Sequence, residues 1–585
     1  MTEFRVWAPT PALVRLDVEG TVHAMTRSDD GWWHTTVPTT PTARYGYLLD
    51  DDPTVLPDPR SARQPDGVHA RSQLWQSAGP ADASWTDGDW VGRSVDGAVI
   101  YELHIGTFTA RGTFDAAIAK LDYLVDLGID FVELMPVNSF AGVHGWGYDG
   151  VLWYSVHEPY GGPDGLVRFI DACHTRGLGV LIDAVFNHLG PSGNYLPHFG
   201  PYLSKAKNPW GQGINIADAD SDEVRRYIIE CALRWMRDFH ADGLRLDAVH
   251  ALLDTTAIHI LEELASETSW LSEQVGRPLS LIAESDLNDP RLITARRQGG
   301  YGLTAQWSDD IHHAIHAAVS GEHQGYYADF GADSRSIGVL ARTLRHGYFH
   351  AGTYSSFRRR RHGRALDITA ISGIPATSLI AFTCTHDQVG NRALGDRPSQ
   401  RLTEGQLAIK AALVLASPYT ALLFMGEEWG ASSPFQFFSS HPEPELARAT
   451  SQGRRAEFAE HGWPADGIPD PQDPQTFQRS KLNWDEVSSG GHARLHQLYR
   501  DLISLRRNEP DMADPWLDHL VVDYDEAQRW ITLRRNRLVI ACNLGVNATR
   551  VPVSGELVLA WNRPTITHTD TELPGHSFAM LRCRS

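Results

Sequence analysis

The sequence predicts an α/β fold: a (β/α)8 TIM barrel with one β-sandwich before it and another after it. Short apolar strands alternate with helical segments from Ala98 onward, and this alternation is typical of right-handed βαβ units in a parallel sheet. Residues 1–90 and 516–585 instead hold strand-like segments separated by turn residues, which is typical of sandwiches. A chain of 585 residues is long enough for a barrel of roughly 400 residues and two smaller domains.

The N-terminal domain is predicted to span residues 1–90 as a β-sandwich that resembles carbohydrate-binding modules. Its expected strands are FRVWAPT, Leu13–Val18 and YGYLLD, and we expect Trp32 and Trp33 to sit at a turn. The stretch 50–96 is rich in Pro, Asp, Gly and Ser, so we predict a long connection there rather than core.

The barrel is predicted within residues 91–515. Its eight strands are expected to begin near Ala98, Ile129, Gly179, Gly243, Leu279, Leu303, Ser378 and Tyr419. Helical periodicity is expected between them, at Phe114–Leu127, Gly165–Arg176, Val224–His240, Thr255–Glu267 and Glu404–Ala416. Residues 433–484 form a polar excursion after the last strand, and long excursions of this kind are often functional. The last domain, 516–585, is predicted to hold five strands: HLVVDYD, RWITLRRN, RLVIACNL, ATRVPVS and ELVLAWN.

Charge and cysteine content restrict the possible partners and location. The formal net charge of −20 argues against nucleic acid as a partner, because phosphate backbones require basic patches. No apolar run approaches the length of a membrane span, and MTEFRVWAPT has neither the basic start nor the apolar stretch of a signal peptide. The five cysteines are far apart and odd in number, so we expect cytoplasmic thiols rather than disulfides or a zinc site. The basic run at Arg358–Arg361 is expected to be a solvated loop.

Four carboxylic residues end predicted barrel strands: Asp183, Asp247, Glu284 and Asp387. An acid after a strand is usually a turn former or helix cap. Four at one face are harder to explain that way, because desolvated like charges cost energy unless function requires them. Reactive side chains of parallel barrels lie at this C-terminal face.

The spacing of Arg245 and Asp247 adds a chemical role. Side chains two apart on a strand point to the same side, so Arg245 could keep Asp247 ionised. Glu284 follows apolar LSLIA with no adjacent cation in the sequence, which favours a protonated acid. One ionised and one protonated carboxyl group are what glycoside cleavage requires. The alternative is a structural salt bridge at the barrel rim.

Histidines and aromatic residues lie beside these acids. His188 and His386 could donate hydrogen bonds to sugar hydroxyls, although each could equally be an ordinary loop residue. Tyr148 and Trp210 lie in Gly-rich loops and are candidate platforms for sugar rings. A metal site is the weaker alternative, because no HxH or HExxH spacing is present and Arg245 would repel a cation.

Together, DAVFNH, GLRLDAVH, LIAES and FTCTHD resemble the four conserved stretches of the α-amylase family of glycoside hydrolases, in order, between Ala98 and about Gly430. The resemblance implies that Asp247 is the nucleophile, Glu284 the general acid/base and Asp387 the transition-state stabiliser. It places Asp183, His188, Arg245 and His386 around the sugar at the cleavage site. It also implies that Asn187 occupies a position that often helps to bind calcium. With no second acidic cluster, we predict no required metal and no cofactor.

Further segments, among them HGWGYDGV, NPWGQGIN and AESDLNDPRL, resemble the trehalose-releasing hydrolases of this family. That resemblance implies malto-oligosyltrehalose as substrate and malto-oligosyltrehalose synthase as functional partner. We count Asp286 among the substrate-binding residues; His250 either lines a product-side subsite or is structural. The N-terminal sandwich resembles that of glycogen-branching enzymes, so a branching-type transferase is the first alternative. A non-catalytic glycan-binding barrel is the second.

Overall fold

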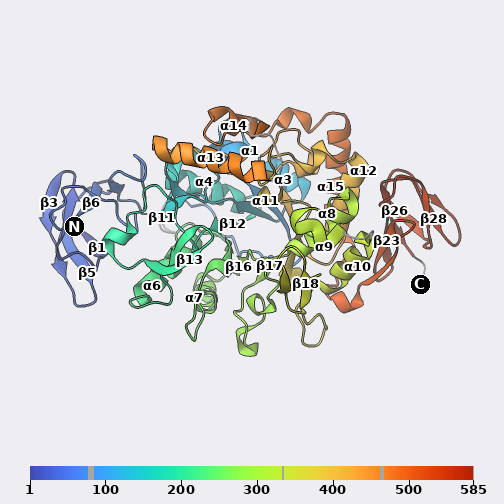
Figure 1. Ribbon diagram of the computed structural model, residues 1–585, viewed down its shortest axis with the longest axis horizontal. Coiled ribbons are helices and arrows are strands. Elements are labelled where there is room, and N and C mark those ends of the chain that lie inside the picture. The colour runs from blue at the N-terminus through green and yellow to red at the C-terminus, as the bar shows by residue number, and fades with distance from the viewer. Residues whose placement is uncertain (77–84, 332–334, 461–466, 584–585) are drawn as a thin grey trace.

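The computed structural model describes residues 1–76, 85–331, 335–460 and 467–583. Three parts follow one another along the long axis of the molecule: N-terminal sheets, a central barrel and C-terminal sheets (Figure 1). The predicted fold class is confirmed. The domain limits at residues 90 and 515 stay predictions.

The barrel is closed, with the strand order β12-β15-β16-β17-β20-β21-β8-β9. Every neighbouring pair is parallel. All eight predicted strands are confirmed; they are β8 (Val99–Leu103), β9 (Phe131–Leu134), β12 (Gly179–Ala184), β15 (Gly243–Leu246), β16 (Ser280–Ala283), β17 (Ala305–Trp307), β20 (Leu379–Phe382) and β21 (Thr420–Phe424). Their interior and exterior faces are both buried, which explains the near-continuous apolar runs in the sequence.

Helices and hairpins surround this barrel. The longer helices are α4 (Gly162–His174), α6 (Asp222–Arg237), α7 (Ile260–Val275), α8 (Asp309–Ser320), α10 (Ser336–His346), α12 (Glu404–Leu415), α13 (Pro444–Glu460) and α15 (Gly490–Asn508). The shorter ones are α1 (Ile105–Phe108), α2 (Phe114–Ile118), α3 (Leu121–Leu127), α5 (Leu196–Phe199), α9 (Ala328–Gly331), α11 (His386–Gly390) and α14 (Pro474–Arg479). The hairpins are β10 (Asn138–Phe140) with β11 (Gly150–Val156), β13 (Leu203–Asn208) with β14 (Gly211–Ile214), and β18 (Thr353–Ser355) with β19 (Arg360–His362).

Two helix predictions differ most from the structure in their bounds. The segment predicted at Phe114–Leu127 is two helices, α2 and α3. The helix predicted from Thr255 begins only at Ile260 and continues to Val275. Arg225 explains the late start, because its guanidinium binds Asp254 at 2.7 Å and the Ile258 carbonyl at 2.8 Å, which holds the intervening residues in a turn.

The N-terminal sandwich pairs sheet β1-β5-β4 with sheet β3-β2-β6-β7. Its strands are β1 (Thr2–Trp7), β2 (Val14–Val18), β3 (Thr21–Ala24), β4 (Thr26–Arg27), β5 (Trp32–Val37), β6 (Arg44–Leu49) and β7 (Ser72–Gln73). The turn prediction for Trp32 and Trp33 is wrong, because both begin strand β5. Trp33 is buried and its indole donates to the Ala8 carbonyl at 3.0 Å, so packing fixes it within the sheet.

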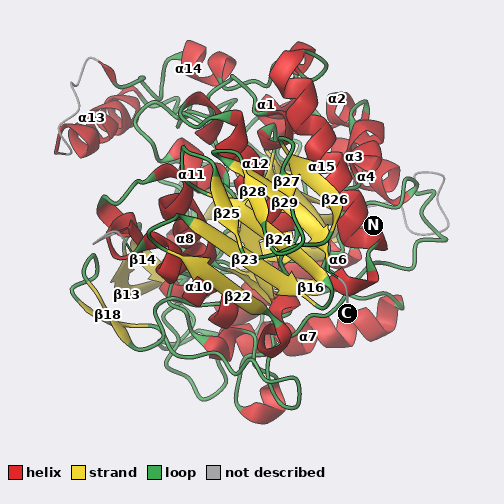
Figure 2. Ribbon diagram, turned by 90° about the vertical axis from the view of Figure 1, so that its right-hand side faces the viewer, coloured by secondary structure: helices red, strands yellow, loops and turns green. Residues whose placement is uncertain are grey.

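The C-terminal domain has the five predicted strands and three more. A five-stranded sheet, β22-β23-β24-β29-β26, is joined by a small sheet, β25-β28-β27 (Figure 2). The strands are β22 (Val521–Asp525), β23 (Trp530–Arg535), β24 (Leu538–Asn543), β25 (Thr549–Val551), β26 (Glu556–Trp561), β27 (Thr565–Ile566), β28 (Thr571–Leu573) and β29 (Ser577–Arg582). The missed strand β29 lies between β24 and β26, and five of its six residues are buried, so it lacks the alternation that marks a half-exposed strand.

The connection after the N-terminal sandwich runs beneath the barrel, at the opposite end from the carboxylates. Part of the predicted connection, residues 77–84, lies outside the described residues. The part that follows docks on buried Asp242, whose carboxylate accepts from Trp90 at 2.8 Å, His174 at 3.0 Å and Arg277 at 2.9 Å. Asp87 of the connection contacts the other ring nitrogen of His174 at 2.8 Å. Polar contacts therefore close the bottom of the barrel.

Asp242→Asn should lower the free energy of unfolding by about 3 kcal/mol, because removing one partner leaves buried His174 and Arg277 underpaired. Burial alone would lower the pKa of His174, but its hydrogen bonds to Asp242 and Asp87 outweigh burial and raise it. A raised folded-state pKa gives stability that is complete below the unfolded value and lost as pH rises through the folded value. Urea unfolding of parent and variant should therefore differ most below about pH 6.5 and less at alkaline pH. The exposed change Asp89→Asn is the control, and an equal loss there would contradict this account.

Candidate active site

Three of the four strand-end carboxyl groups, those of Asp183, Asp247 and Glu284, converge on one guanidinium. Arg245 Nη1 donates to Asp183 at 2.9 and 2.8 Å and to Asp247 at 2.8 Å. Its Nη2 lies 3.8 Å from Glu284 Oε2. The side chain of Arg245 is 1% exposed, and its guanidinium carbon lies 4.4 Å from the centre of the Trp307 ring. The expected contact between Arg245 and Asp247 is confirmed.

Asp247 is held from a second direction by Asn187. The Asn187 amide nitrogen donates to the Asp247 carboxylate at 2.7 Å and to its backbone carbonyl at 3.0 Å. The amide oxygen of Asn187 lies 2.5 Å from Nδ1 of His188. Both ends of the amide are therefore engaged within the protein, and the Asp247 carboxylate has two fixed donors that orient it.

Glu284 differs electrostatically from Asp247. No cation is adjacent to it in the sequence, but Arg245 approaches it in space. Burial nevertheless dominates: it raises the pKa of Glu284 well above the usual range, Arg245 opposes this, and the charge of Asp247 adds to it. The Ala248 backbone N–H donates to Glu284 Oε2 at 2.7 Å, with Ala248 at φ 42°. A non-glycine residue in this left-handed region is strained, and such strain is common at functional sites.

His386 links Asp387 to the rest of the site. Its Nδ1 lies 2.5 Å from Glu102 Oε1, and its Nε2 lies 2.9 Å from the Tyr148 hydroxyl and 3.4 Å from Asp387 Oδ1. Burial would lower the pKa of His386, but Asp387 and Glu102 outweigh it and raise the pKa to about 9. A protonated imidazole therefore stands between two carboxylates.

Tyr148 completes a chain of contacts across the site. Its hydroxyl donates to Asp183 at 2.5 Å, and its ring stacks on His386 with centroids 5.2 Å apart. Burial raises the pKa of Asp183 to about 6, against the opposing effect of Arg245. Contacts therefore run from Arg245 through Asp183 and Tyr148 to His386.

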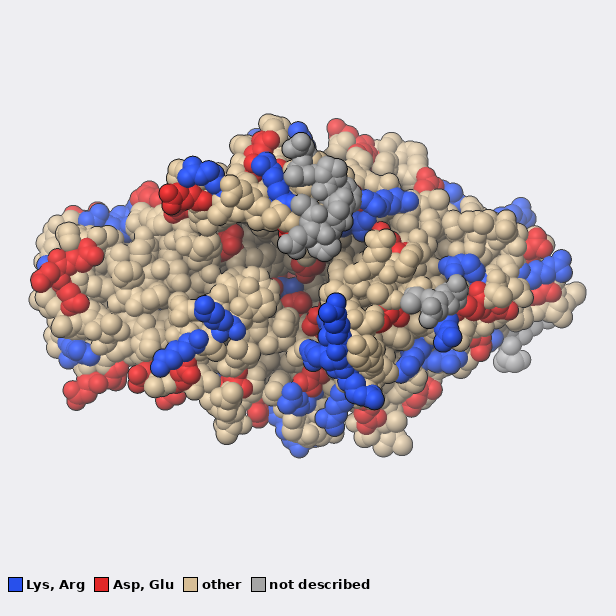
Figure 3. Space-filling model, viewed as in Figure 1, with Lys and Arg blue, Asp and Glu red and all other residues tan. Residues whose placement is uncertain are grey.

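A cleft of about 370 Å³ opens over these residues. Its lining includes the sequence-predicted residues Tyr148, His188, Trp210, Asp247, His386 and Asp387. Trp210 is 51% exposed and stacks on His188 with centroids 5.2 Å apart, so one indole face is available to a sugar ring. Figure 3 shows a hollow at the centre of the molecule with acidic side chains at its floor.

Asp286 and His250 are not among the residues that line this cleft. Asp286 forms an ion pair with Arg358, and its backbone carbonyl lies 2.7 Å from Nε2 of His362. Arg358 is thus tied to the loop after β16. The neighbouring basic side chains gather near the β18–β19 hairpin, below the hollow (Figure 3). His250 lies in a short turn, Val249–Ala251, directly after Asp247.

Several residues of the site were not found from the sequence. Glu102 is an acid inside the apolar strand VIYEL, and a charged residue in such a strand could have indicated a functional role. Trp307 is one apolar residue among many on its strand. The excursion contributes Thr450, Arg454 and Glu457 to the cleft, and no sequence pattern connects them to the carboxylates.

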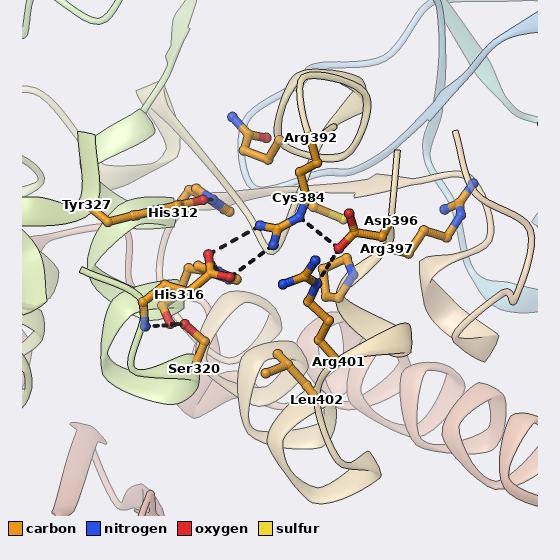
Figure 4. Close-up of a pocket in the computed structure, with 13 residues that line it drawn as sticks. His312, His316, Ser320, Tyr327, Cys384, Arg392, Asp396, Arg397, Arg401 and Leu402 are labelled. Atoms are coloured by element: carbon orange, nitrogen blue, oxygen red, sulfur yellow. Dashed lines mark hydrogen bonds and ion pairs between the residues drawn. The ribbon is translucent and has the colours of Figure 1, made fainter. Parts of the chain in front are cut away.

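A second, smaller cavity of about 20 Å³ lies behind α11, the helix that carries Asp387. Arg392 spans it with contacts to Glu322 at 3.0 Å and Asp396 at 2.9 Å, and His316 lies 2.9 Å from Glu322 (Figure 4). These charges satisfy one another, so the cluster braces the segment that follows α11.

Within the described ranges, no group of three or more His, Cys, Asp or Glu side chains is arranged to hold a metal ion. In the same ranges, no helix combines the length and apolar character needed to cross a membrane. The absence of a required metal or cofactor stays a prediction.

Comparison with known proteins agrees with the geometry. The family described as "Alpha amylase, catalytic domain" matches residues 76–208, and "Domain of unknown function (DUF3459)" matches residues 515–580. A malto-oligosyltrehalose trehalohydrolase of Mycobacterium tuberculosis is 79% identical over 100% of this chain and 99% of its own. One of Arthrobacter ramosus is 54% identical over 99% of each. A crystal structure described as an alpha amylase of Salmonella typhimurium is 38% identical, with TM-score 0.89, and covers 100% of this chain and 97% of that one.

The closed barrel, its strand-end carboxylates and these matches define a glycoside hydrolase of the α-amylase type. Because the relatives match along the whole length, the chain belongs more narrowly to the malto-oligosyltrehalose trehalohydrolase family.

Glu102→Gln should lower the pKa of His386, because it removes a buried carboxylate from the imidazolium. The alkaline limb of kcat/KM on an α-1,4-glucan substrate should then move down by about one to two pH units, the equivalent of one charged hydrogen bond. Rates measured from pH 5 to 10 check this, with the exposed change Glu273→Gln as control. An unmoved alkaline limb would show that the pair of His386 and Glu102 does not set this limb.

Proposed function

We propose that this chain hydrolyses the α-1,4-glucosidic bond next to the terminal trehalose unit of malto-oligosyltrehalose, with retention of configuration, and releases trehalose. The names of its full-length relatives support the substrate. One observation carries the chemistry: Arg245 and Asn187 donate to Asp247, whereas burial raises the pKa of Glu284. The two carboxyl groups are therefore suited to opposite states of protonation.

In the proposed reaction, Glu284 gives its proton to the oxygen that leaves with trehalose. Asp247 attacks the anomeric carbon, so the glycosidic C–O bond breaks as an ester bond to the carboxylate forms. Glu284, now ionised, takes a proton from water, and that water displaces Asp247 and restores the α configuration. Retention requires the two carboxyl groups to stand about 5–5.5 Å apart across the bond.

The remaining residues bind and stabilise the reacting sugar. Asp387 is 38% exposed and lines the cleft. In the proposal it accepts hydrogen bonds from sugar hydroxyls and stabilises the cation-like transition state. His386, protonated and held by Glu102, can donate to a hydroxyl. Tyr148 and Trp210 offer ring faces. Arg245 donates to both Asp183 and Asp247 and so fixes their positions.

The alternative is transfer of the same glycosyl ester to a sugar hydroxyl, as in a branching enzyme. Only the attacking group differs, and the barrel cannot distinguish the two reactions. The full-length identity to trehalohydrolases favours hydrolysis.

Incubation with malto-oligosyltrehalose should release trehalose and an α-anomeric malto-oligosaccharide, because two displacements restore the starting configuration. Proton NMR during the first minutes reports the anomer, and maltoheptaose is the comparison substrate. Faster cleavage of maltoheptaose would reject the trehalose specificity. New branched or lengthened glucans would support the transferase, and an initial β-anomer would reject retention.

Glu284→Gln should reduce kcat for trehalose release by about 10²–10⁴-fold, the usual contribution of general acid–base catalysis. The isosteric amide keeps the volume of the side chain and removes only the titrating proton. Glu273→Gln on the surface of α7 is the control and should match the parent. A Glu284→Gln variant as active as the parent would end this assignment and revive a glycan-binding role.

We also propose a cytoplasmic location and a functional link to malto-oligosyltrehalose synthase. The five cysteines are all free thiols, which supports a reducing compartment. The link to the synthase follows from the proposed substrate alone.

A further inference from the structure

One wall of the cleft comes from helix α13 in the excursion after the barrel. Thr450, Arg454 and Glu457 line the cleft together with Asp247 and Asp387. Their spacing of four and three residues puts them on one face of the helix. Figure 1 shows α13, in orange, along the upper edge of the barrel mouth, and Figure 3 shows the hollow beneath it.

This wall is fastened to the helix that carries Asp387. Arg454 Nη2 donates to the carbonyl of Gly390 at 2.8 Å and to that of Arg392 at 3.3 Å, at and just beyond the end of α11. The Arg454 side chain is 9% exposed, and its guanidinium carbon lies 5.3 Å from the centre of the Phe437 ring. The wall therefore has a fixed position relative to the reacting sugar.

A small apolar cluster adds to this attachment. Phe458, one turn beyond Arg454, is buried with Ala393 and Ile468. On the same side of α13, seven residues before Phe458, Ser451 donates to Asp470 at 2.6 Å. These contacts hold the helix along one side and leave its Thr450–Glu457 face toward the cleft.

The position of the acid indicates which part of the substrate this cleft receives. Arg245 separates two sides of the site. Its Nη1 contacts Asp183 and Asp247, next to the cleft-lining residue Tyr148, whereas its Nη2 faces Glu284 at 3.8 Å. In the proposed reaction the acid stands on the side of the leaving group, which is trehalose. The cleft therefore extends from the reacting glucose toward the opposite side, where the malto-oligosaccharide arm lies.

We infer that Thr450, Arg454 and Glu457 form a subsite for the malto-oligosaccharide arm and set the preferred chain length; this rests on the proposed function. Glucose units present hydroxyl donors and acceptors together with apolar ring faces. Threonine, arginine and glutamate supply both kinds of hydrogen bond. Phe437 and Trp210, in the same cleft, supply apolar surface.

The test compares maltosyltrehalose with maltopentaosyltrehalose in the double variant Thr450→Ala/Glu457→Ala. This variant removes the ion pair of Glu457 with Arg454 but keeps the hydrogen bonds of Arg454 to the Gly390 and Arg392 carbonyls. The kcat/KM for the longer substrate should fall about tenfold through KM, as expected for one or two lost hydrogen bonds, with kcat unchanged. The shorter substrate should change less than twofold. Arg448→Gln, exposed on the same helix, is the matched control and should behave as the parent. Equal losses on both substrates, or no loss on either, would overturn the inference.

Product inhibition determines which side the wall serves. Inhibition by maltopentaose should weaken about tenfold in the double variant, whereas inhibition by trehalose should not change. The reverse pattern would place the wall on the trehalose side and overturn the assignment. If the double variant does not fold by circular dichroism, the isosteric change Glu457→Gln takes its place in both measurements.

If the parent enzyme releases no trehalose, that result contradicts the proposed function and does not by itself contradict this inference. In that case, calorimetric titration of maltopentaose into the parent and the double variant tests the wall directly. Weaker binding by the variant supports a glucan subsite, and equal affinity overturns it.

Discussion

The active site depends on one buried cation, Arg245, and on the carboxyl groups that surround its guanidinium. It contacts Asp183 and Asp247 directly and reaches Glu284 at 3.8 Å, in a setting where its side chain is 1% exposed. An unpaired charge at such depth would be very costly, so the cation and the carboxylates require each other. His386 is the second cation, between Glu102 and Asp387. Burial raises the pKa of Glu284, and the charge of Asp247 adds to it, so a further negative charge there is unfavourable and a proton stays available.

The barrel produces this arrangement from separate segments of the chain. Parallel strands bring their carboxyl ends to one rim, so side chains distant in sequence meet without any local pattern. The loops that hold the rim are braced in turn: α11 by Arg454 on one side and by the Arg392 cluster on the other. Rigid supports of this kind keep reacting groups within the narrow geometry that catalysis requires.

Most of the barrel and the main carboxylates could be predicted from the sequence, and the reasons are physical. Strand ends such as that after GLRLD are marked by an abrupt change from apolar to acidic residues. The misses came where distant contacts override local signals. Trp32 and Trp33 lie in a strand because of partners in β1, and β29 is buried too fully to alternate. The wall residues on α13 could not be found because their link to Asp387 runs through the carbonyls of Gly390 and Arg392, which no sequence pattern reveals.

The connection beneath the barrel limits how this architecture can be divided. Trp85 stacks on His240 with ring centroids 3.9 Å apart, and Trp90 donates to Asp242. The connection after the N-terminal sandwich therefore also covers the end of the barrel opposite the carboxylates. Cutting the chain near residue 90 would separate these contacts and expose aromatic and acidic side chains on both fragments. The N-terminal domain therefore cannot be exchanged independently of the barrel. A different N-terminal domain would have to supply its own segment to cover this end of the barrel, or keep the present one.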